Sequence, residues 1–247
     1  MARILLITDN FLPHLGGSRI IFYNICRRLP AGEVFVLTKF IRGSGGFDRR
    51  QKFKIFRVFL FKLPQKIFGF LSEIPLYISL LVSAIFAVLV NKIKIIFAGE
   101  TLPCGFIAFL LKKALGIPYI VFTFAEDITI VSKLNRERVI QRMVLREADV
   151  IIATCSFIEE FLENKVGVDP KKIIKVYPAV DDEIIDFKIN MSKLNEIKNK
   201  KGLEDKKVIF SCARLIERKG IDNVIRALRR VVENIPRVVY LIGGDGE

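Results

Sequence analysis

Short apolar runs alternate with helical stretches along most of the chain, and this alternation limits the folds that it can adopt. The first run, residues 3–8, leads into polar and glycine residues and then into a helical pattern at 20–29. Continuous apolar runs are typical of strands that are buried on both faces of a parallel sheet. Further runs of this kind follow at 33–38, 54–59, 93–98, 118–123, 150–154 and 173–176. Helical stretches at 72–91, 103–115, 134–147 and 156–166 separate several of them. We therefore predict an α/β fold with helices on both faces of a mostly parallel sheet.

A second, shorter unit follows. Residues 181–206 are polar and rich in lysine, which is typical of a linker with a surface helix. Residues 207–247 then repeat the order strand, loop, helix, strand. One such βαβ unit of about 40 residues is too small to close its own core. We expect a complete Rossmann-like domain at 1–180, a linker at 181–206 and an incomplete second Rossmann-like domain at 207–247.

Charge and composition narrow the possible partners. The chain has 40 Lys and Arg against 26 Asp and Glu, a net charge of +14, so anionic partners are expected. Its one histidine, His14, excludes a multi-histidine metal site and disfavours a Ser-His-Asp triad. The four cysteines show no C-x-x-C spacing, which favours free thiols in a reducing compartment. The apolar run in the opening MARILLITDN is too short for a signal peptide, so we expect a cytoplasmic protein.

An uncharged apolar stretch covers residues 74–90. Three interpretations remain open: a helix buried in the fold, a helix lying in a membrane interface, or a full span. Upstream, residues 39–66 carry nine basic residues against one acidic residue, Asp48, and are interleaved with phenylalanines. This pattern indicates either contact with an anionic membrane or a solvated basic edge whose phenylalanines face the core. No zinc-finger or RNP pattern accompanies the charge, and we expect no nucleic-acid partner.

Two loops have the composition of phosphate-binding segments. Gly16 and Gly17 stand between the first strand and the first helix, where the lack of side chains lets a phosphate approach backbone amides. Arg214 and Lys219 follow the first strand of the second unit, at the edge where α/β proteins bind ligands. The structural alternative for the two glycines is a plain tight turn, and the alternative for Arg214 and Lys219 is ordinary surface charge. The first loop reads PHLGGS rather than G-x-G-x-x-G, which disfavours a nicotinamide enzyme.

These segments together resemble GT-B glycosyltransferases of family 4. The resemblance rests on ITDNFLPHLGGSRIIFYNICRRL, KVYPAVDDEII, FSCARLIERKGIDNVIRAL and VVYLIGGDGE, in the family's order and across essentially the whole chain. It implies that Gly16, Gly17, Arg214, Lys219 and Gly244 hold the donor diphosphate. It also implies a retaining reaction in which fixed cations replace a metal, so no metal or other cofactor is expected.

The sequence departs from the family pattern at two places. Ala125 stands where the family usually has a histidine, and Glu126 and Asp127 follow it. These carboxylates could bind or deprotonate an acceptor hydroxyl, or could only cap a helix. The family's E-x7-E motif would fall beyond Glu247, so the chain is expected to be truncated at its C-terminus.

The resemblance implies transfer of a sugar from a nucleotide-diphosphate sugar. A lipid-linked or cell-envelope polysaccharide acceptor suits the basic, apolar first domain, with the enzyme peripheral at the inner face of the cell membrane. The alternative is a non-catalytic, membrane-associated module that binds acceptor or lipid.

Overall fold

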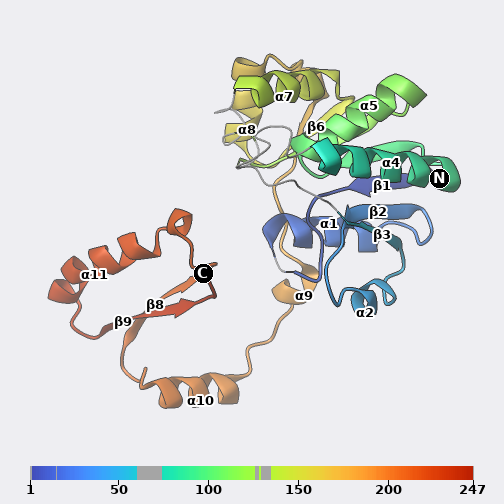
Figure 1. The fold of residues 1–247 in the computed structure, drawn as a ribbon. Coiled ribbons are helices and arrows are strands. Elements are labelled where there is room, and N and C mark those ends of the chain that lie inside the picture. Colours follow the sequence, from blue (N-terminus) through green and yellow to red (C-terminus); the bar gives the residue numbers. More distant parts are fainter. Residues whose placement is uncertain (1, 15, 60–73, 126–127, 129–134, 247) are drawn as a thin grey trace. The chain divides into compact units, whose positions relative to one another are not determined.

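The computed structural model describes residues 2–14, 16–59, 74–125, 128 and 135–246 (Figure 1). It divides into two compact units, Met1–Asp181 and Asp182–Glu247. The two units are described separately below.

The first unit is built on a sheet of seven parallel strands in the order β3-β2-β1-β4-β5-β6-β7. This confirms the predicted α/β fold, and each predicted apolar run contributes one strand. The strands are β1 (Ile4–Ile7), β2 (Val34–Lys39), β3 (Lys54–Val58), β4 (Ile95–Ala98), β5 (Tyr119–Thr123), β6 (Val150–Ala153) and β7 (Ile173–Lys175).

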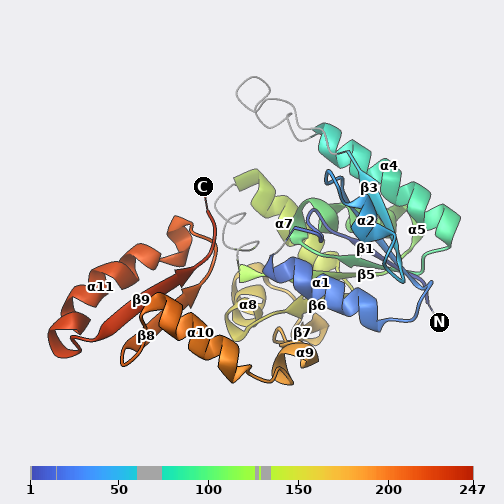
Figure 2. The ribbon, with the colours of Figure 1, turned by 90° about the horizontal axis from the view of Figure 1, so that it is seen from below.

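Helices cover both faces of this sheet. Helix α1 lies on one face, and α4 and α5 lie on the other (Figures 1 and 2). The α-helices are α1 (Gly17–Arg28), α2 (Gly45–Asp48), α4 (Ile74–Asn91), α5 (Phe106–Leu115), α7 (Asn135–Glu147) and α8 (Ser156–Phe161). Shorter helical turns are η2 (Thr101–Gly105), η3 (Leu162–Val166) and η4 (Pro170–Lys172).

The strands are apolar without alternation because both of their faces are buried. In β1, Leu5 and Ile7 pack into the cluster that includes Leu80 of α4, whereas Leu6 packs with Phe22 of α1 on the other face. Successive side chains of a strand point to opposite faces, so the strands β1 to β6 contribute to both clusters, whereas β7 contributes Ile173 to the first cluster only. The sheet therefore has two apolar cores, one beneath each helical layer.

The second unit contains two parallel strands, β8 (Lys207–Cys212) and β9 (Val238–Gly243). Its helices are α9 (Asp182–Ile185), α10 (Met191–Lys201), the short η5 (Glu217–Lys219) and α11 (Ile221–Asn234). Leu203 is the one buried hydrophobic residue among those that the structure describes here, and Phe210 of β8 is 63% exposed. A single βαβ arrangement leaves strand faces uncovered because it has one helix for two faces.

Three buried side chains hold ionisable protons inside the first unit. Burial raises the pKa of Cys26 to about 12 and the pKa of Cys104 well above its usual value. Tyr119 donates its hydroxyl proton to the carbonyl oxygen of Val144, and burial together with Glu147 and Asp149 raises its pKa. All three groups are therefore neutral in the folded protein.

These groups predict a loss of stability in alkaline solution. Above pH 9.0 an unfolded cysteine ionises whereas folded Cys26 does not, so the unfolded state binds fewer protons. The free energy of unfolding should then fall by about 1.4 kcal/mol per pH unit for each such thiol, up to the folded pKa. Urea unfolding followed by circular dichroism across this range measures the slope. The variant Cys26→Ala should show a shallower slope, and an equal slope in both proteins would contradict the prediction.

Candidate functional site

The strand order places a ligand-binding edge between β1 and β4. The chain crosses to β2 on one side of β1 and to β4 on the other, so the connections diverge at this point. In open α/β sheets, ligands bind outside the carboxyl ends of the strands where the order reverses in this way. The residues that follow β1 and β4 at this edge are Thr8, Asp9, Asn10, Gly99 and Glu100.

The carboxylate of Glu100 joins the ends of these two strands. One of its oxygens accepts hydrogen bonds from the backbone N–H of Asp9 at 2.5 Å and from the Cys104 thiol at 2.9 Å. Its other oxygen accepts a hydrogen bond from the Thr8 hydroxyl at 3.2 Å. Burial and then the negative charge of Glu100 raise the pKa of Cys104, so its thiol keeps the proton that it donates.

Cationic side chains from neighbouring elements reach the same edge. Arg19 of α1 donates a hydrogen bond to the Asn10 side chain at 2.9 Å. The ammonium group of Lys39, at the end of β2, lies 3.9 Å from the Asp9 carboxylate. The edge therefore carries both carboxylates and cations, which suits a polar ligand with hydroxyl and phosphate groups.

The glycine loop opens onto this edge. Gly16 is the N-cap residue of α1 and makes no side-chain cap, so the first-turn amides of the helix are not capped by it. A Cβ built on Gly17 would meet nothing within 4 Å, whereas one on Gly16 would lie 3.2 Å from the Arg19 side chain. The space beside Gly17 at the helix N-terminus is therefore open, and phosphate binding there stays a prediction. The loop residue His14 is exposed.

The second unit brings Arg214, Lys219 and Gly244 to the carboxyl edge of its own strands. The loops after β8 and β9 continue the strand pairing, because Ala213 N–H bonds to Gly243 O at 3.0 Å and Leu215 N–H to Asp245 O at 2.9 Å. Arg214 and Lys219 are exposed, and neither side chain has a hydrogen bond or ion pair with the described part of the chain. Within the described residues these two cations have no counter-charge, and their binding of a donor diphosphate stays a prediction.

Gly244 has a packing reason to be glycine. A Cβ on this residue would overlap the carbonyl group of Ala213 in the neighbouring loop. The missing side chain therefore allows the two loops to approach each other, whatever the loop binds. Asp222, the first-turn acidic residue of α11, pairs with Arg226 at 2.8 Å within its own helix.

Glu126 and Asp127, the candidate catalytic carboxylates, lie outside the described residues. Glu100 is not among the predicted site residues, although a signal for it exists. Like Asp9, it is a polar residue two positions after the end of a buried strand, and the two strands become neighbours only in the folded sheet.

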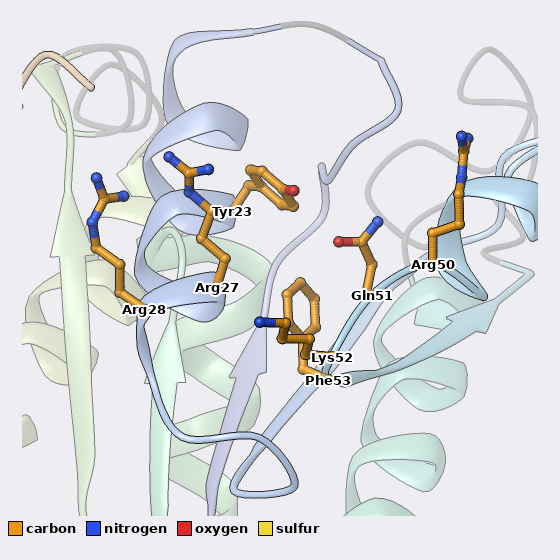
Figure 3. A pocket seen from close by; sticks show the side chains of 7 residues that line it. All are labelled: Tyr23, Arg27, Arg28, Arg50, Gln51, Lys52 and Phe53. Carbon is orange, nitrogen blue, oxygen red and sulfur yellow. The ribbon is translucent and has the colours of Figure 1, made fainter. Parts of the chain in front are cut away.

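A basic pocket of about 420 Å³ lies elsewhere on the first unit, between α1 and the segment that enters β3 (Figure 3). Two of its cations already bind Asp181, since Arg27 and Arg28 contact that carboxylate at 2.5 Å and 3.0 Å. Although desolvation opposes ionisation, these hydrogen bonds and charges hold the pKa of Asp181 below its usual value. The contacts attach Asp181, the last residue of the first unit, to α1. The lining residues are Tyr23, Arg27, Arg28, Arg50, Gln51, Lys52 and Phe53.

In the part of the chain that the structure describes, no three His, Cys, Asp or Glu side chains are grouped so that they could hold a metal ion.

A parallel α/β unit followed by a second α/β unit is the arrangement of the GT-B class of glycosyltransferases. Residues 15–184 match Glycosyltransferase Family 4, and residues 194–247 match Glycosyl transferases group 1. The first match spans more than half of the 247 residues, so the chain belongs to glycosyltransferase family 4. The resemblance inferred from the sequence motifs is confirmed.

Solved structures share this fold at low sequence identity. HepE of Anabaena, in complex with UDP and glucose, is 17% identical with a TM-score of 0.74, over 100% of this chain and 62% of that chain. A glycosyltransferase from Rickettsia africae is 10% identical with a TM-score of 0.63, over 98% of this chain and 68% of that chain. The N-terminal domain of trehalose-6-phosphate phosphatase from Candida albicans is 12% identical with a TM-score of 0.70, over 100% of this chain and 65% of that chain.

These likenesses show the fold alone, because the sequence identities are only 10–17%. The chain spans less than two thirds of the length of HepE. No curated protein matches the sequence.

The hydrogen bonds of Glu100 predict its contribution to stability. Replacing it in Glu100→Ala leaves the Asp9 amide, the Thr8 hydroxyl and the Cys104 thiol without their shared acceptor. We expect the free energy of unfolding to fall by about 1–3 kcal/mol, and by less in Glu100→Gln, which restores one acceptor oxygen. Urea unfolding measures both changes.

The exposed Glu160 supplies the control. The variant Glu160→Ala should stay within about 0.5 kcal/mol of the parent protein. Equal effects of Glu100→Ala and Glu160→Ala would show that the Glu100 carboxylate does not hold the strand ends together.

Proposed function

We propose that the protein transfers a sugar from a nucleotide-diphosphate sugar to an acceptor hydroxyl. The observation that carries this proposal is the pair of cations Arg214 and Lys219 at the carboxyl edge of β8 and β9 in a family 4 chain. Neither side chain has a hydrogen bond or ion pair with a described residue. UDP-sugars are the donors to test first, since HepE was solved with UDP and glucose.

Charge separation during transfer explains the need for these cations. The bond between the sugar C1 and the diphosphate oxygen breaks, and the electron pair leaves with the nucleoside diphosphate. The acceptor oxygen forms the new bond to C1 and loses its proton. Arg214 and Lys219 would stabilise the negative charge that grows on the leaving diphosphate, which is the task that a divalent metal performs in other enzymes. Gly16 and Gly17 would let the phosphates or the sugar approach the N-terminus of α1.

Carboxylates of the first unit would bind the acceptor and take the proton from its hydroxyl group. We propose Glu126 and Asp127 to bind or deprotonate the acceptor hydroxyl. Asp9 and Glu100 add carboxylates beside the glycine loop, and Glu100 acts as a positioning residue because three groups of the fold already bind it. Retention of the anomeric configuration and independence from metal ions are part of the proposal by family membership.

For the acceptor, we propose a lipid-linked or cell-envelope polysaccharide, with the enzyme peripheral at the inner face of the cell membrane. The support is the charge of +14 together with 51% hydrophobic residues. The competing proposal is a module that binds acceptor or lipid without chemistry, and it predicts vesicle binding with no release of nucleoside diphosphate.

Substitution of the two cations tests the transfer reaction. In the full polypeptide that carries this sequence, Arg214→Ala and Lys219→Ala should each lower the turnover of a sugar nucleotide by about 10²–10³-fold. The assay is release of UDP from UDP-glucose and from other UDP-sugars, with a membrane extract as the source of acceptor. Thermal unfolding should be unchanged because both side chains are exposed and neither has a hydrogen bond or ion pair with a described residue.

The exposed Arg229 of α11 supplies a matched control. Arg229→Ala removes the same charge from the same unit, away from the strand edge, and should leave turnover unchanged. If Arg214→Ala and Lys219→Ala also keep full turnover, these cations do not hold the donor diphosphate.

A further inference from the structure

Helix α4 is apolar on both of its faces. Its inner face packs on the sheet through Leu76, Leu80, Ala84, Ala87 and Val88, and the helix contacts β1, β2 and β3. A helix on the surface of a soluble fold normally carries polar residues on its outer face. The outer face of α4 instead exposes large apolar side chains, namely Ile74, Ile78, Val82, Ile85, Phe86, Leu89 and Val90.

The degree of exposure is high at the middle and end of the helix. Val82, Phe86 and Leu89 are 61%, 64% and 62% exposed. The helix carries no charged residue, and its 18 residues span about 27 Å. The outer face is therefore a long apolar stripe whose exposure to water is unfavourable.

Two aromatic residues extend this stripe at the carboxyl edge of the sheet. Phe40 and Phe59 stack with their ring centroids 4.3 Å apart, and they are 44% and 60% exposed. The hydroxyl of Ser79 in α4 donates a hydrogen bond to the carbonyl oxygen of Phe59, so this pair lies next to the helix. A groove of about 400 Å³ between α4 and β3 continues the apolar surface and is lined by Leu37, Phe56, Val58, Val82, Ser83, Phe86 and Ala87.

Basic residues border the apolar surface. Lys39 ends β2 on the α4 face of the sheet, since it alternates with Phe35 and Leu37 of the core beneath α4. Lys54 begins β3 and shares the α4 face of the sheet with Phe56, and the exposed Lys92 and Lys94 follow the end of α4. An apolar stripe with a basic border matches an anionic lipid surface.

Other occupants of this face fit less well. Among the described residues, Ile74–Asn91 is the one helix that is long and apolar enough to cross a membrane, with a mean hydropathy of 2.2. A crossing would pull its inner face away from the sheet and expose Leu5, Ile7 and Leu37 of the core. A symmetric dimer through this face would bring the same basic residues of two copies together.

We propose that the outer face of α4, with Phe40 and Phe59, lies in the boundary between headgroups and acyl chains of an anionic membrane, parallel to its surface. Figure 2 shows α4 at the margin of the first unit. The inference deepens the proposed function, because it names the surface that would bring the enzyme to a lipid-linked acceptor. It does not depend on the transfer reaction itself.

Vesicle sedimentation tests this surface. The full chain should bind vesicles of phosphatidylcholine mixed with phosphatidylglycerol, and should bind more weakly at high salt and to phosphatidylcholine alone. The variant Phe86→Ser/Leu89→Ser should lower the affinity by about tenfold or more, since both side chains leave water on binding. Circular dichroism and thermal unfolding confirm that the variant is folded.

Phe157→Ser is the matched control. Phe157 is also exposed, at 55%, and it lies on α8, which packs on β6 and β7 at the far end of the sheet from β3. This variant should bind vesicles like the parent chain.

Three outcomes would overturn the proposal. The first is equal vesicle binding by Phe86→Ser/Leu89→Ser and the parent chain. The second is resistance of the bound protein to alkaline carbonate extraction, which indicates a spanning helix. The third is no vesicle binding together with a dimer that Phe86→Ser/Leu89→Ser dissociates. None of these results bears on the turnover test of Arg214 and Lys219, so the two proposals fail separately.

Discussion

Burial of the central strands on both faces is the constraint on which the rest of the first unit depends. Leu5 and Leu6 are adjacent in β1 yet pack into cores on opposite sides of the sheet. A strand of this kind needs a helix above and a helix below, and parallel neighbours need a crossover between them. The same constraint collects all of the loops that leave the strands at one edge. The polar residues that follow the strands, Asp9 and Glu100 among them, therefore face a common space.

The geometry at that edge depends on the carboxylate of Glu100, which stabilises the fold. Glu100 accepts hydrogen bonds from the ends of two strands and from a buried thiol. A side chain held by three donors has little freedom, which suits a residue that positions others. Arg214 and Lys219 in the second unit show the opposite arrangement, since no described group of the protein satisfies their charge. Glu100 therefore orders the strand ends of the first unit, whereas Arg214 and Lys219 are the cations that we propose to bind the donor diphosphate.

Helix α4 also has two roles, one in the core of the first unit and one at its surface. Its inner face packs on the sheet, and the proposed orientation parallel to the membrane keeps this packing intact. Its outer face has no such role in the core, yet it is as apolar as the inner face. The energetic difference between the two faces is that one is already removed from water and the other is not. The proposed contact with an anionic membrane removes the second face as well.

Much of the architecture could be predicted from the sequence. The apolar runs identify the seven strands of the first unit because doubly buried strands need no polar alternation, and the motif around Arg214 and Lys219 identifies the family because charge and glycine spacing are local properties. Pairing of distant segments could not be predicted in this way. Glu100 gains its partners only when β4 lies beside β1, Gly244 gains its packing role only against Ala213, and the stretch at 74–90 shows two faces only when one of them meets the sheet. The sequence by itself determined the helices, the strands and the family, because apolar runs and motif spacing are local patterns. The tertiary structure alone decided which polar groups meet and which apolar face stays in water, because both follow from contacts between residues far apart in the chain.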